Sequence, residues 1–414
     1  MKIRIAGRRF GAAVCIGLIA TAALTIPAQA KSSHRGDLID ITPIAEASRN
    51  TIIDDLTAGG FAFTPDQVRN PVHAYRLTYR TIDENGKATT ASGLFVLPDT
   101  NNRSISTITY LHGTMAGRDE APSVADRSND LYASYLYSSA GYATVAPDYV
   151  GLGTGPGLHP YLDVADATDA SVDMLDAART AAHQLGRNLR QDVYVNGFSQ
   201  GAVVALGLGR ALQDGAVRGM RAAAIAPISG PYELENAEIP AALSTDPAQL
   251  SQADSTFYLA YTLTAWQRVY HIYTDPSAVF QAPYDKTVPP LFNGANDEDV
   301  IFPKLPSTPQ QLITPAFVAE LNHPTGRLLA ALRANDDTCS NWRPTMPIRF
   351  FYADGDEQVS AADTTQCRAD LTAHGVPSTV VDVGTVGHSA SAQRSVTQVL
   401  TWFGAPWFDA SRSR

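Results

Sequence analysis

A serine lies between two glycines at the spacing G-x-S-x-G, in Gly197-Phe198-Ser199-Gln200-Gly201. The motif follows a stretch at 192–198 that predicts a strand, and it precedes small, apolar residues at 201–212 that predict a helix. In a strand–turn–helix setting this spacing is typical of a nucleophilic serine whose Oγ projects from a strained turn. Glycines flank the serine because strand and helix approach too closely there for side chains. We therefore predict Ser199 as a nucleophile.

A serine hydroxyl becomes a good nucleophile only when a base accepts its proton. In this chain order the acid and then the histidine should follow the serine. His374 precedes Gly375 at the end of a predicted helix, where its charge would favour the helix dipole. His388 instead follows a predicted strand at 379–383 after a short loop. We predict His388 as the base.

Two aspartates follow the strand predicted at 348–353, and both could reach the base. Asp356 is followed by two residues and then Val359, a spacing typical of the turn that carries a catalytic acid. Asp354 would then form a turn by bonding its own backbone. A calcium loop that includes Glu357 is the alternative, but the remaining ligands of such a loop are missing from the sequence. We predict Asp356 as the acid, with Asp354 as the second candidate.

Acyl transfer also needs hydrogen-bond donors directed at the developing oxyanion. One donor should be the backbone N–H of Gln200, the residue after the nucleophile. The second should come from the loop at Tyr110-Leu111-His112-Gly113-Thr114, in which the glycine permits a tight turn. We predict the backbone N–H of Thr114 as this donor, and we expect His112 to brace the loop by hydrogen bonding.

A second glycine-rich segment, 147–161, lies between a predicted strand and a predicted helix. Its glycines do not follow the G-x-G-x-x-G spacing and no helix begins among them, so a dinucleotide-binding loop is not predicted. We interpret it as a loop beside the active site, with Asp148 and His159 as structural anchors. The sequence also lacks a Walker motif, an H-E-x-x-H motif and a metal-binding cluster, so we expect neither a cofactor nor a metal.

The order of predicted elements places this chemistry on an α/β fold. Strands alternate with helices, which argues for a mostly parallel sheet with helices on both faces. Between Gly230 and Pro344 the alternation stops, and a segment rich in proline and aromatic residues predicts a mainly helical cap. We therefore expect a core domain at 31–230 and 345–414 and a cap, or lid, at 231–344. Strands are expected at 72–82, 89–97 (after a turn at 83–86), 105–111, 142–146, 192–198, 222–228, 348–353 and 379–383.

A helix predicted at 163–185 has five aspartates on one side and apolar residues on the other. Such an acidic stripe can bind a cation, but a solvated helix face is the more common arrangement and the one we predict. The five residues of this acidic stripe are Asp163, Asp166, Asp169, Asp173 and Asp176.

Residues 1–30 have the pattern of a secretory signal peptide: basic residues, an apolar run at 11–26 and Ala28-Gln29-Ala30. That run is shorter than the roughly 20 apolar residues of a membrane-spanning helix. Four of the 31 Lys and Arg lie in this segment, which leaves 27 basic against 41 acidic residues. A surface this acidic excludes nucleic acid and anionic lipid as principal partners. We expect a monomeric, secreted or periplasmic protein without stable membrane insertion.

Two cysteines lie beyond the predicted signal peptide, Cys339 and Cys367. In an oxidising compartment a single pair predicts one disulfide. A zinc site is the competing interpretation, but the pair lacks C-x-x-C spacing and nearby histidines. We predict the disulfide.

Together these motifs resemble α/β-hydrolases of the secretory-lipase type, a group that includes fungal secretory lipases and exported bacterial esterases, some of which attack plant cell walls. The resemblance is carried by the 110–114 loop, the 147–161 segment and the motif around Ser199, in that order along the chain. It implies an α/β-hydrolase fold with a helical lid inserted after the sixth strand. It also implies hydrolysis of carboxylic esters by a Ser199, Asp356 and His388 triad without a cofactor.

The expected substrate is a small-molecule ester with a short- to medium-chain acyl group, either a lipid ester or a glycan ester of the cell wall. Two other functions stay open: an exported peptidase or acyltransferase on the same fold, and a non-catalytic protein that binds carbohydrate or lipid. The complete set of serine, acid and histidine argues against the binding protein. Aromatic residues of the cap could line a substrate groove or form the cap's own core: Phe257, Tyr258, Tyr261 and Trp266.

Overall fold

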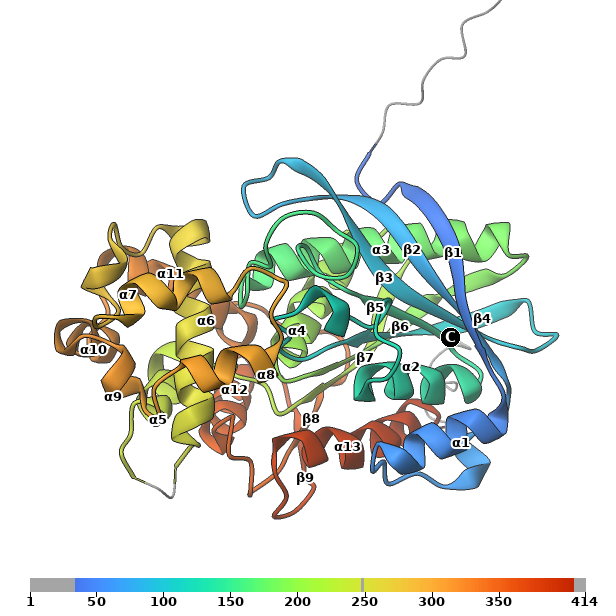
Figure 1. The fold of residues 1–414 in the computed structure, drawn as a ribbon. Helices are drawn as coiled ribbons and strands as arrows, with labels where there is room; N and C mark the ends of the chain where they lie inside the picture. Colours follow the sequence, from blue (N-terminus) through green and yellow to red (C-terminus); the bar gives the residue numbers. More distant parts are fainter. Residues whose placement is uncertain (1–33, 247–248, 406–414) are drawn as a thin grey trace, which may run out of the picture. The chain divides into compact units, whose positions relative to one another are not determined.

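A nine-stranded sheet forms the centre of the fold in the computed structural model, which describes residues 34–246 and 249–405 (Figure 1). The strand order is β1-β2-β3-β5-β4-β6-β7-β8-β9. The first three strands and β5 pair antiparallel, and every other neighbouring pair is parallel. The strands are β1 Leu38–Ala47, β2 Val72–Ile82, β3 Ala88–Pro98, β4 Ser104–Leu111, β5 Ala143–Pro147, β6 Asn188–Phe198, β7 Arg221–Ile228, β8 Arg349–Tyr352 and β9 Thr379–Asp382.

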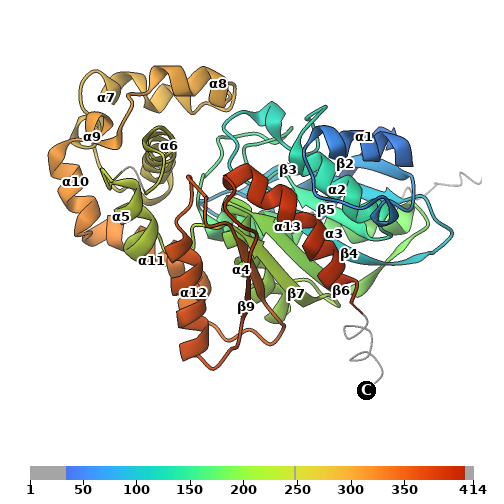
Figure 2. The same ribbon diagram turned by 90° about the horizontal axis from the view of Figure 1, so that it is seen from below.

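Helices cover both faces of the sheet, and each face has its own hydrophobic core. Neighbouring strand residues divide between the two cores: Val193 and Val195 of β6 belong to one and Tyr194 to the other, as the two-residue period of a strand requires. This confirms the predicted α/β architecture. One face carries α3 Val164–Gln184, α4 Gln200–Gln213 and α12 Ala361–Ala373, and the other carries α1 Arg49–Ala58, α2 Asn129–Ser139 and α13 His388–Phe403 (Figure 2).

The first strand and helix were not predicted from the sequence. In β1 most side chains are exposed or half-buried, and Pro43 lies at an irregularity of its pairing with β2. Proline is tolerated in such an edge strand because the unpaired side needs no N–H donor. The predicted hairpin of β2 and β3 is confirmed, with Asp83 Oδ1 accepting from Lys87 N at 2.9 Å across the turn.

The acidic stripe of α3 is not a solvated face, and that prediction is wrong. Asp163, Asp166 and Asp173 are buried. Asp173 accepts hydrogen bonds from Thr81 Oγ1 (2.7 Å) and Arg35 Nε (3.0 Å), because β2 and the chain before β1 pack over this side of the helix. Both carboxylate oxygens of Asp166 lack a partner among the described residues. Burial, followed by the charge of Asp163, raises the pKa of Asp166 to about 9, so its carboxyl is protonated at neutral pH.

Between β7 and β8 the described residues form helices and helical turns, apart from one isolated bridge. We call residues 231–344 the cap, and its helices share a hydrophobic core that contains Phe257, Tyr261 and Trp266. The strand before the cap is the sixth predicted one, and it becomes β7 because β1 precedes it. The domain boundaries themselves stay a prediction. The cap elements are η3 Leu234–Glu238, α5 Ile239–Ala242, α6 Gln252–Tyr270, η4 Pro276–Ala278, α7 Tyr284–Thr287, η5 Pro289–Leu291, α8 Glu298–Ile301, η6 Phe302–Lys304, α9 Pro309–Leu312, α10 Pro315–Asn322 and α11 Gly326–Ser340.

The predicted disulfide is present and joins α11, the last helix of the cap, to α12. Cys339 and Cys367 are 28 residues apart in sequence and both are fully buried. Closing a loop of this length restricts the unfolded chain and stabilises the fold by about 3–4 kcal/mol in the chain-entropy account.

The signal peptide predicted at 1–30 lies outside the described residues. Within residues 34–246 and 249–405, no helix has the length and apolar character needed to cross a membrane.

Candidate active site

Ser199 occupies the turn between β6 and α4, as the motif predicts. Its φ of 55° and ψ of −122° lie outside the regions that most residues adopt. A Cβ on Gly197 would lie 2.0 Å from Gly201 O, and one on Gly201 would lie 2.1 Å from Leu111 O. Only glycine fits at these two positions. The strained turn is held by the bond from Ser199 N to Ile228 O (2.9 Å), which ties it to β7.

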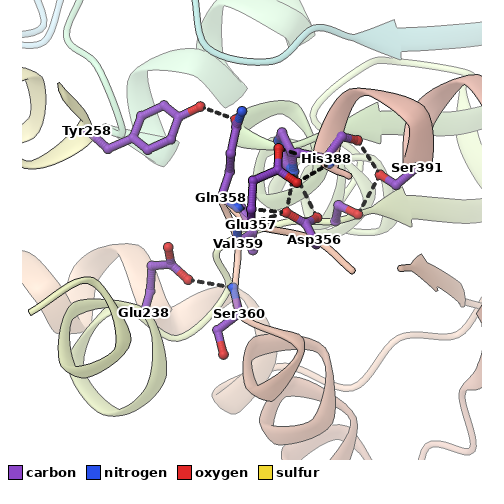
Figure 3. Close-up of polar contacts among 10 residues, drawn as sticks. Glu238, Tyr258, Asp356, Glu357, Gln358, Val359, Ser360, His388 and Ser391 are labelled. Atoms are coloured by element: carbon purple, nitrogen blue, oxygen red, sulfur yellow. Dashed lines mark hydrogen bonds and ion pairs between the residues drawn. The ribbon is translucent and has the colours of Figure 1, made fainter. Parts of the chain in front are cut away.

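His388 and Asp356 form a buried pair (Figure 3). His388 Nδ1 lies 2.9 Å from Asp356 Oδ2 and 3.0 Å from Oδ1. Asp356 Oδ1 also accepts the N–H groups of Gln358 and Val359, each at 3.0 Å, which fixes the orientation of the carboxylate. Because the carboxylate accepts the Nδ1 proton, Nε2 is the ring nitrogen left to act as a base. This Nε2 is buried and has no hydrogen-bond partner among the described residues.

The imidazole lies beside the serine turn. The ring of Phe198, the residue before Ser199, packs on the His388 ring with 4.6 Å between centroids. Ser391 fixes the first turn of α13: its Oγ donates to His388 O (2.7 Å) and bonds Ser229 Oγ (2.8 Å) at the end of β7. The base is therefore anchored to the same strands that hold the serine.

The alternative acid and base lie elsewhere. Asp354 is exposed after β8, and His374 is exposed at the C-terminal end of α12. Neither has a bond to the His388–Asp356 pair. In the described part of the chain, no group of three or more His, Cys, Asp or Glu side chains is arranged to hold a metal ion.

Glu357, weighed above only as a calcium ligand, has a different role. Its carboxylate accepts the backbone N–H of His388 at 3.2 Å, at the N-terminus of α13. A carboxylate there satisfies a helix N–H that has no intrahelical acceptor. The sequence carries a weak signal for this contact, because Glu357 is next to the predicted acid.

The two predicted oxyanion donors line the same cavity as Ser199. The N–H of Gln200 is the first of α4, where backbone N–H groups have no acceptor within the helix. Thr114 follows β4, and its Oγ1 bonds Tyr161 OH at 2.9 Å. A Cβ on Gly113 would press on the Phe198 ring at 3.2 Å, so the glycine allows this loop to approach the serine turn.

Two buried histidines support these loops by hydrogen bonding. His112 is buried, with Nδ1 2.7 Å from Gly113 O and Nε2 3.3 Å from Asp148 O, as the predicted bracing role requires. His159 Nδ1 donates to Val150 O (3.0 Å), and its Nε2 accepts from the Gln200 side chain (2.9 Å). Burial lowers the pKa of His159 to about 3, so this imidazole stays neutral. The contact to Gln200 joins residues 41 apart and was not predicted.

The cavity at Ser199 is small and mainly apolar, with a volume of about 60 Å³. Of the four aromatic residues considered above, Tyr258 and Trp266 line the cavity, whereas Phe257 and Tyr261 belong to the cap core. Further lining from the cap comes from Leu234, Glu238, Ile239, Ala242, Ser255, Leu259, Thr262, Leu263, Leu321 and Leu328.

Comparisons with known proteins define the class of fold. No protein-family model and no curated protein sequence matches the chain. Among solved structures, a putative hydrolase from Legionella pneumophila superposes with a TM-score of 0.82 and 26% identity, over 91% of this chain and 99% of its own. The ligand-bound form of the rice cell wall degrading esterase LipA from Xanthomonas oryzae superposes with a TM-score of 0.78 and 26% identity. The match covers 92% of this chain and 98% of the esterase chain. Candida antarctica lipase A superposes with a TM-score of 0.63 and 13% identity, over 86% of this chain and 78% of its own. This is a likeness of fold alone.

The chain therefore has the α/β-hydrolase fold. Within that fold it resembles a hydrolase and an esterase, in agreement with the resemblance of its motifs.

Proposed function

We propose that this protein is a serine hydrolase of carboxylic esters, with Ser199 as nucleophile, His388 as base and Asp356 as the acid that orients it. The observation that carries the proposal is the buried His388–Asp356 pair packed beside the strained serine turn. The similarity to the esterase supports the same class of reaction.

The proposed reaction uses groups of this chain at every step. Ser199 Oγ attacks the ester carbonyl while His388 Nε2 accepts its proton, and Asp356 stabilises the imidazolium. The N–H groups of Thr114 and Gln200 bind the oxyanion of the tetrahedral intermediate. His388 then protonates the leaving alcohol, and the acyl-enzyme is hydrolysed by water that gives its proton to the same nitrogen.

The cavity supports an acyl group of modest size. Its lining is mainly apolar and comes largely from the cap, and its volume of about 60 Å³ leaves no room for a long chain without movement of side chains. We propose short- to medium-chain esters as substrates, and esters of lipids or of cell-wall glycans as their natural source. The second of these follows the rice cell wall degrading esterase to which the chain is similar.

The proposal includes export of the protein from the cytoplasm. A predicted signal peptide, a buried disulfide and the net acidic sequence are consistent with a secreted or periplasmic enzyme. Mass measurement of protein recovered outside the cytoplasm tests this, because we expect a mature chain that begins near Lys31. A full-length chain confined to the cytoplasm would contradict it.

The reaction is tested by hydrolysis of p-nitrophenyl esters from acetate to palmitate, together with an aminoacyl anilide. We expect ester cleavage that decreases towards long chains and negligible anilide cleavage. Equal cleavage of ester and anilide would favour a peptidase instead. Transfer of the acyl group to an added alcohol in preference to water would favour an acyltransferase.

A further inference from the structure

The loop that carries Asp356 is held from the cap side by three hydrogen bonds. Tyr258 OH donates to Gln358 Oε1 at 2.5 Å, and Glu238 Oε2 accepts Ser360 N at 3.1 Å (Figure 3). The backbone N–H of Ser251, at the start of α6, donates to Glu357 O at 2.7 Å. Residues 357, 358 and 360 therefore each have a partner in the cap.

These contacts fall on the segment that orients the catalytic carboxylate. Asp356 Oδ1 accepts the N–H groups of Gln358 and Val359, so a shift of this backbone moves the carboxylate relative to His388. In Figure 3 both side chains reach the loop from the left of the view, Tyr258 at Gln358 and Glu238 below it at Ser360. A hydrogen bond to a carboxylate loses strength steeply as its angle departs from linearity.

Glu238 is itself fixed by a second carboxyl, that of Asp363 in α12. Asp363 is fully buried, and its Oδ1 accepts Glu233 N at 2.8 Å. Asp363 Oδ2 is buried without a hydrogen-bond partner among the described residues, and Glu238 is the carboxyl that interacts with Asp363. Two facing carboxyls can bond only when they share one proton, and that proton supplies the missing donor.

The surroundings favour keeping this proton. The pKa of Glu238 is raised to about 7, mainly by burial; the hydrogen bonds to Asp363 and Ser360 N oppose this rise, and the Asp356 carboxylate adds to it. Burial raises the pKa of Asp363 well above its usual range, and the carboxylates of Glu238 and Asp336 add to that shift. Below neutral pH the pair therefore holds at least one proton.

We infer that Glu238 and Tyr258 are positioning residues for the catalytic acid: through the loop 356–360, a seated cap holds Asp356 in line with His388. This inference depends on the proposed triad and extends it, because it assigns to the cap a part in the chemical step. A cap displaced from the core would release the loop 356–360 and with it Asp356. Admission of substrate under the cap is then coupled to the alignment of Asp356 with His388.

The first test is Tyr258→Phe, which removes only the hydroxyl. Loss of one hydrogen bond is expected to lower kcat for p-nitrophenyl acetate by about 3- to 10-fold, with KM nearly unchanged. A loosened Asp356 stabilises the imidazolium less, so the acidic limb of the kcat/KM profile is expected to shift to lower pH. The matched control is Tyr273→Phe, a buried cap tyrosine outside the lining of the catalytic cavity, which is expected to change neither quantity.

A double-mutant cycle tests whether Tyr258 acts through its hydrogen bond to Gln358. If the Tyr258 hydroxyl acts through Gln358, then Gln358→Leu is expected to lower kcat as well, and Tyr258→Phe is expected to cost little more in that background. Additive losses would contradict action through this bond.

Glu238 is tested by rescue. Glu238→Ala removes the acceptor of Ser360 N and is expected to lower kcat. Glu238→Gln keeps an acceptor for Ser360 and offers Asp363 an N–H in place of the shared proton, so it is expected to restore kcat. If Glu238→Ala does not fold, Tyr258→Phe and its cycle decide the matter.

The inference is wrong if Tyr258→Phe raises KM with kcat and the pH profile unchanged, which would make the tyrosine a substrate contact. It is also wrong if the variant only lowers the melting temperature. Both outcomes differ from failure of the proposed function, which would appear as full activity in Ser199→Ala.

Discussion

The two sides of the candidate active site are built by different means. On the sheet side, backbone geometry fixes the groups: Ser199 lies in a strained turn, and Gly197 and Gly201 leave 2.0–2.1 Å between a hypothetical Cβ and backbone oxygens. On the cap side, packed side chains and long-range hydrogen bonds close the cavity, such as the bond from Tyr258 to Gln358. We therefore expect substitutions on the sheet side to abolish the chemical step. Substitutions on the cap side are expected to change its rate or its acyl-chain preference.

The largest expected effect is on the base. His388→Ala removes the proposed acceptor of the serine proton, and kcat/KM for p-nitrophenyl acetate is expected to fall by about 10⁴-fold or more. His374→Ala is the matched control, because this exposed histidine ends α12 and lies outside the site. Similar losses of activity in both variants, or no loss in either, would contradict the assignment of His388 as the base.

The next effect distinguishes the two candidate acids. Asp356→Asn keeps the size of the side chain but presents a neutral amide to His388 Nδ1, so kcat is expected to fall by about 10³- to 10⁴-fold. Asp354→Asn is expected to leave kcat within about twofold, because Asp354 is exposed and does not contact the base. A larger loss in Asp354→Asn than in Asp356→Asn would reverse the assignment.

A smaller effect is expected on the cap side. Leu263→Ala enlarges the cavity beside Ser199, and each added methylene that becomes buried is worth about 0.8 kcal/mol, or roughly fourfold. The ratio of butyrate or hexanoate ester hydrolysis to acetate hydrolysis is therefore expected to rise. Leu332→Ala removes an equally buried leucine from the cap core but not from the cavity lining, so it should lower stability without changing the ratio. A shift in both variants would mean that general loosening of the cap sets acyl preference.

The smallest effect on activity is expected away from the site, where a substitution changes stability alone. The raised pKa of Asp166 means that the folded protein binds a proton which the unfolded chain has released above about pH 4. The contribution of Asp166 to the free energy of unfolding therefore falls as the pH rises from about 4 to 9. Asp166→Asn carries no such charge. Between pH 4 and pH 8 its free energy of unfolding is therefore expected to rise relative to that of the wild type by up to about 5 kcal/mol, at about 1.4 kcal/mol per pH unit.

Denaturant unfolding at the two pH values measures this gain. The half-exposed Asp169 bonds Arg35, and Asp169→Asn is expected to show no comparable gain with pH. An equal pH dependence in both variants would restore the solvated-face interpretation of the acidic stripe.

The residues proposed for the sheet side could be chosen from the sequence because their signals are local. A glycine two residues from Ser199 on each side, and Asp356 three residues before Val359, express backbone constraints within a few residues. The triad assignment needs only these motifs and the chain order of the strands that carry them. The strands of the sheet were likewise predicted from apolar runs, apart from β1, in which Pro43 and exposed side chains hide the pattern.

The cap side could not be predicted in the same way. The bond from Tyr258 to Gln358 joins residues 100 apart, and Glu238 interacts with Asp363, which follows the cap in the sequence. Amphipathic periodicity shows which face of a helix is polar but not what packs on it. The polar side of α3 was therefore assigned to solvent although Thr81 contacts Asp173 there.

The most direct test of the proposed serine chemistry is labelling with a fluorophosphonate, followed by peptide mass spectrometry. An active serine hydrolase forms a covalent adduct only on its activated nucleophile. We predict one adduct, on the peptide that contains Ser199, and none in Ser199→Ala or in wild-type protein unfolded before labelling. A folded wild-type protein that takes no label, or that is labelled on another serine, would contradict the proposed triad.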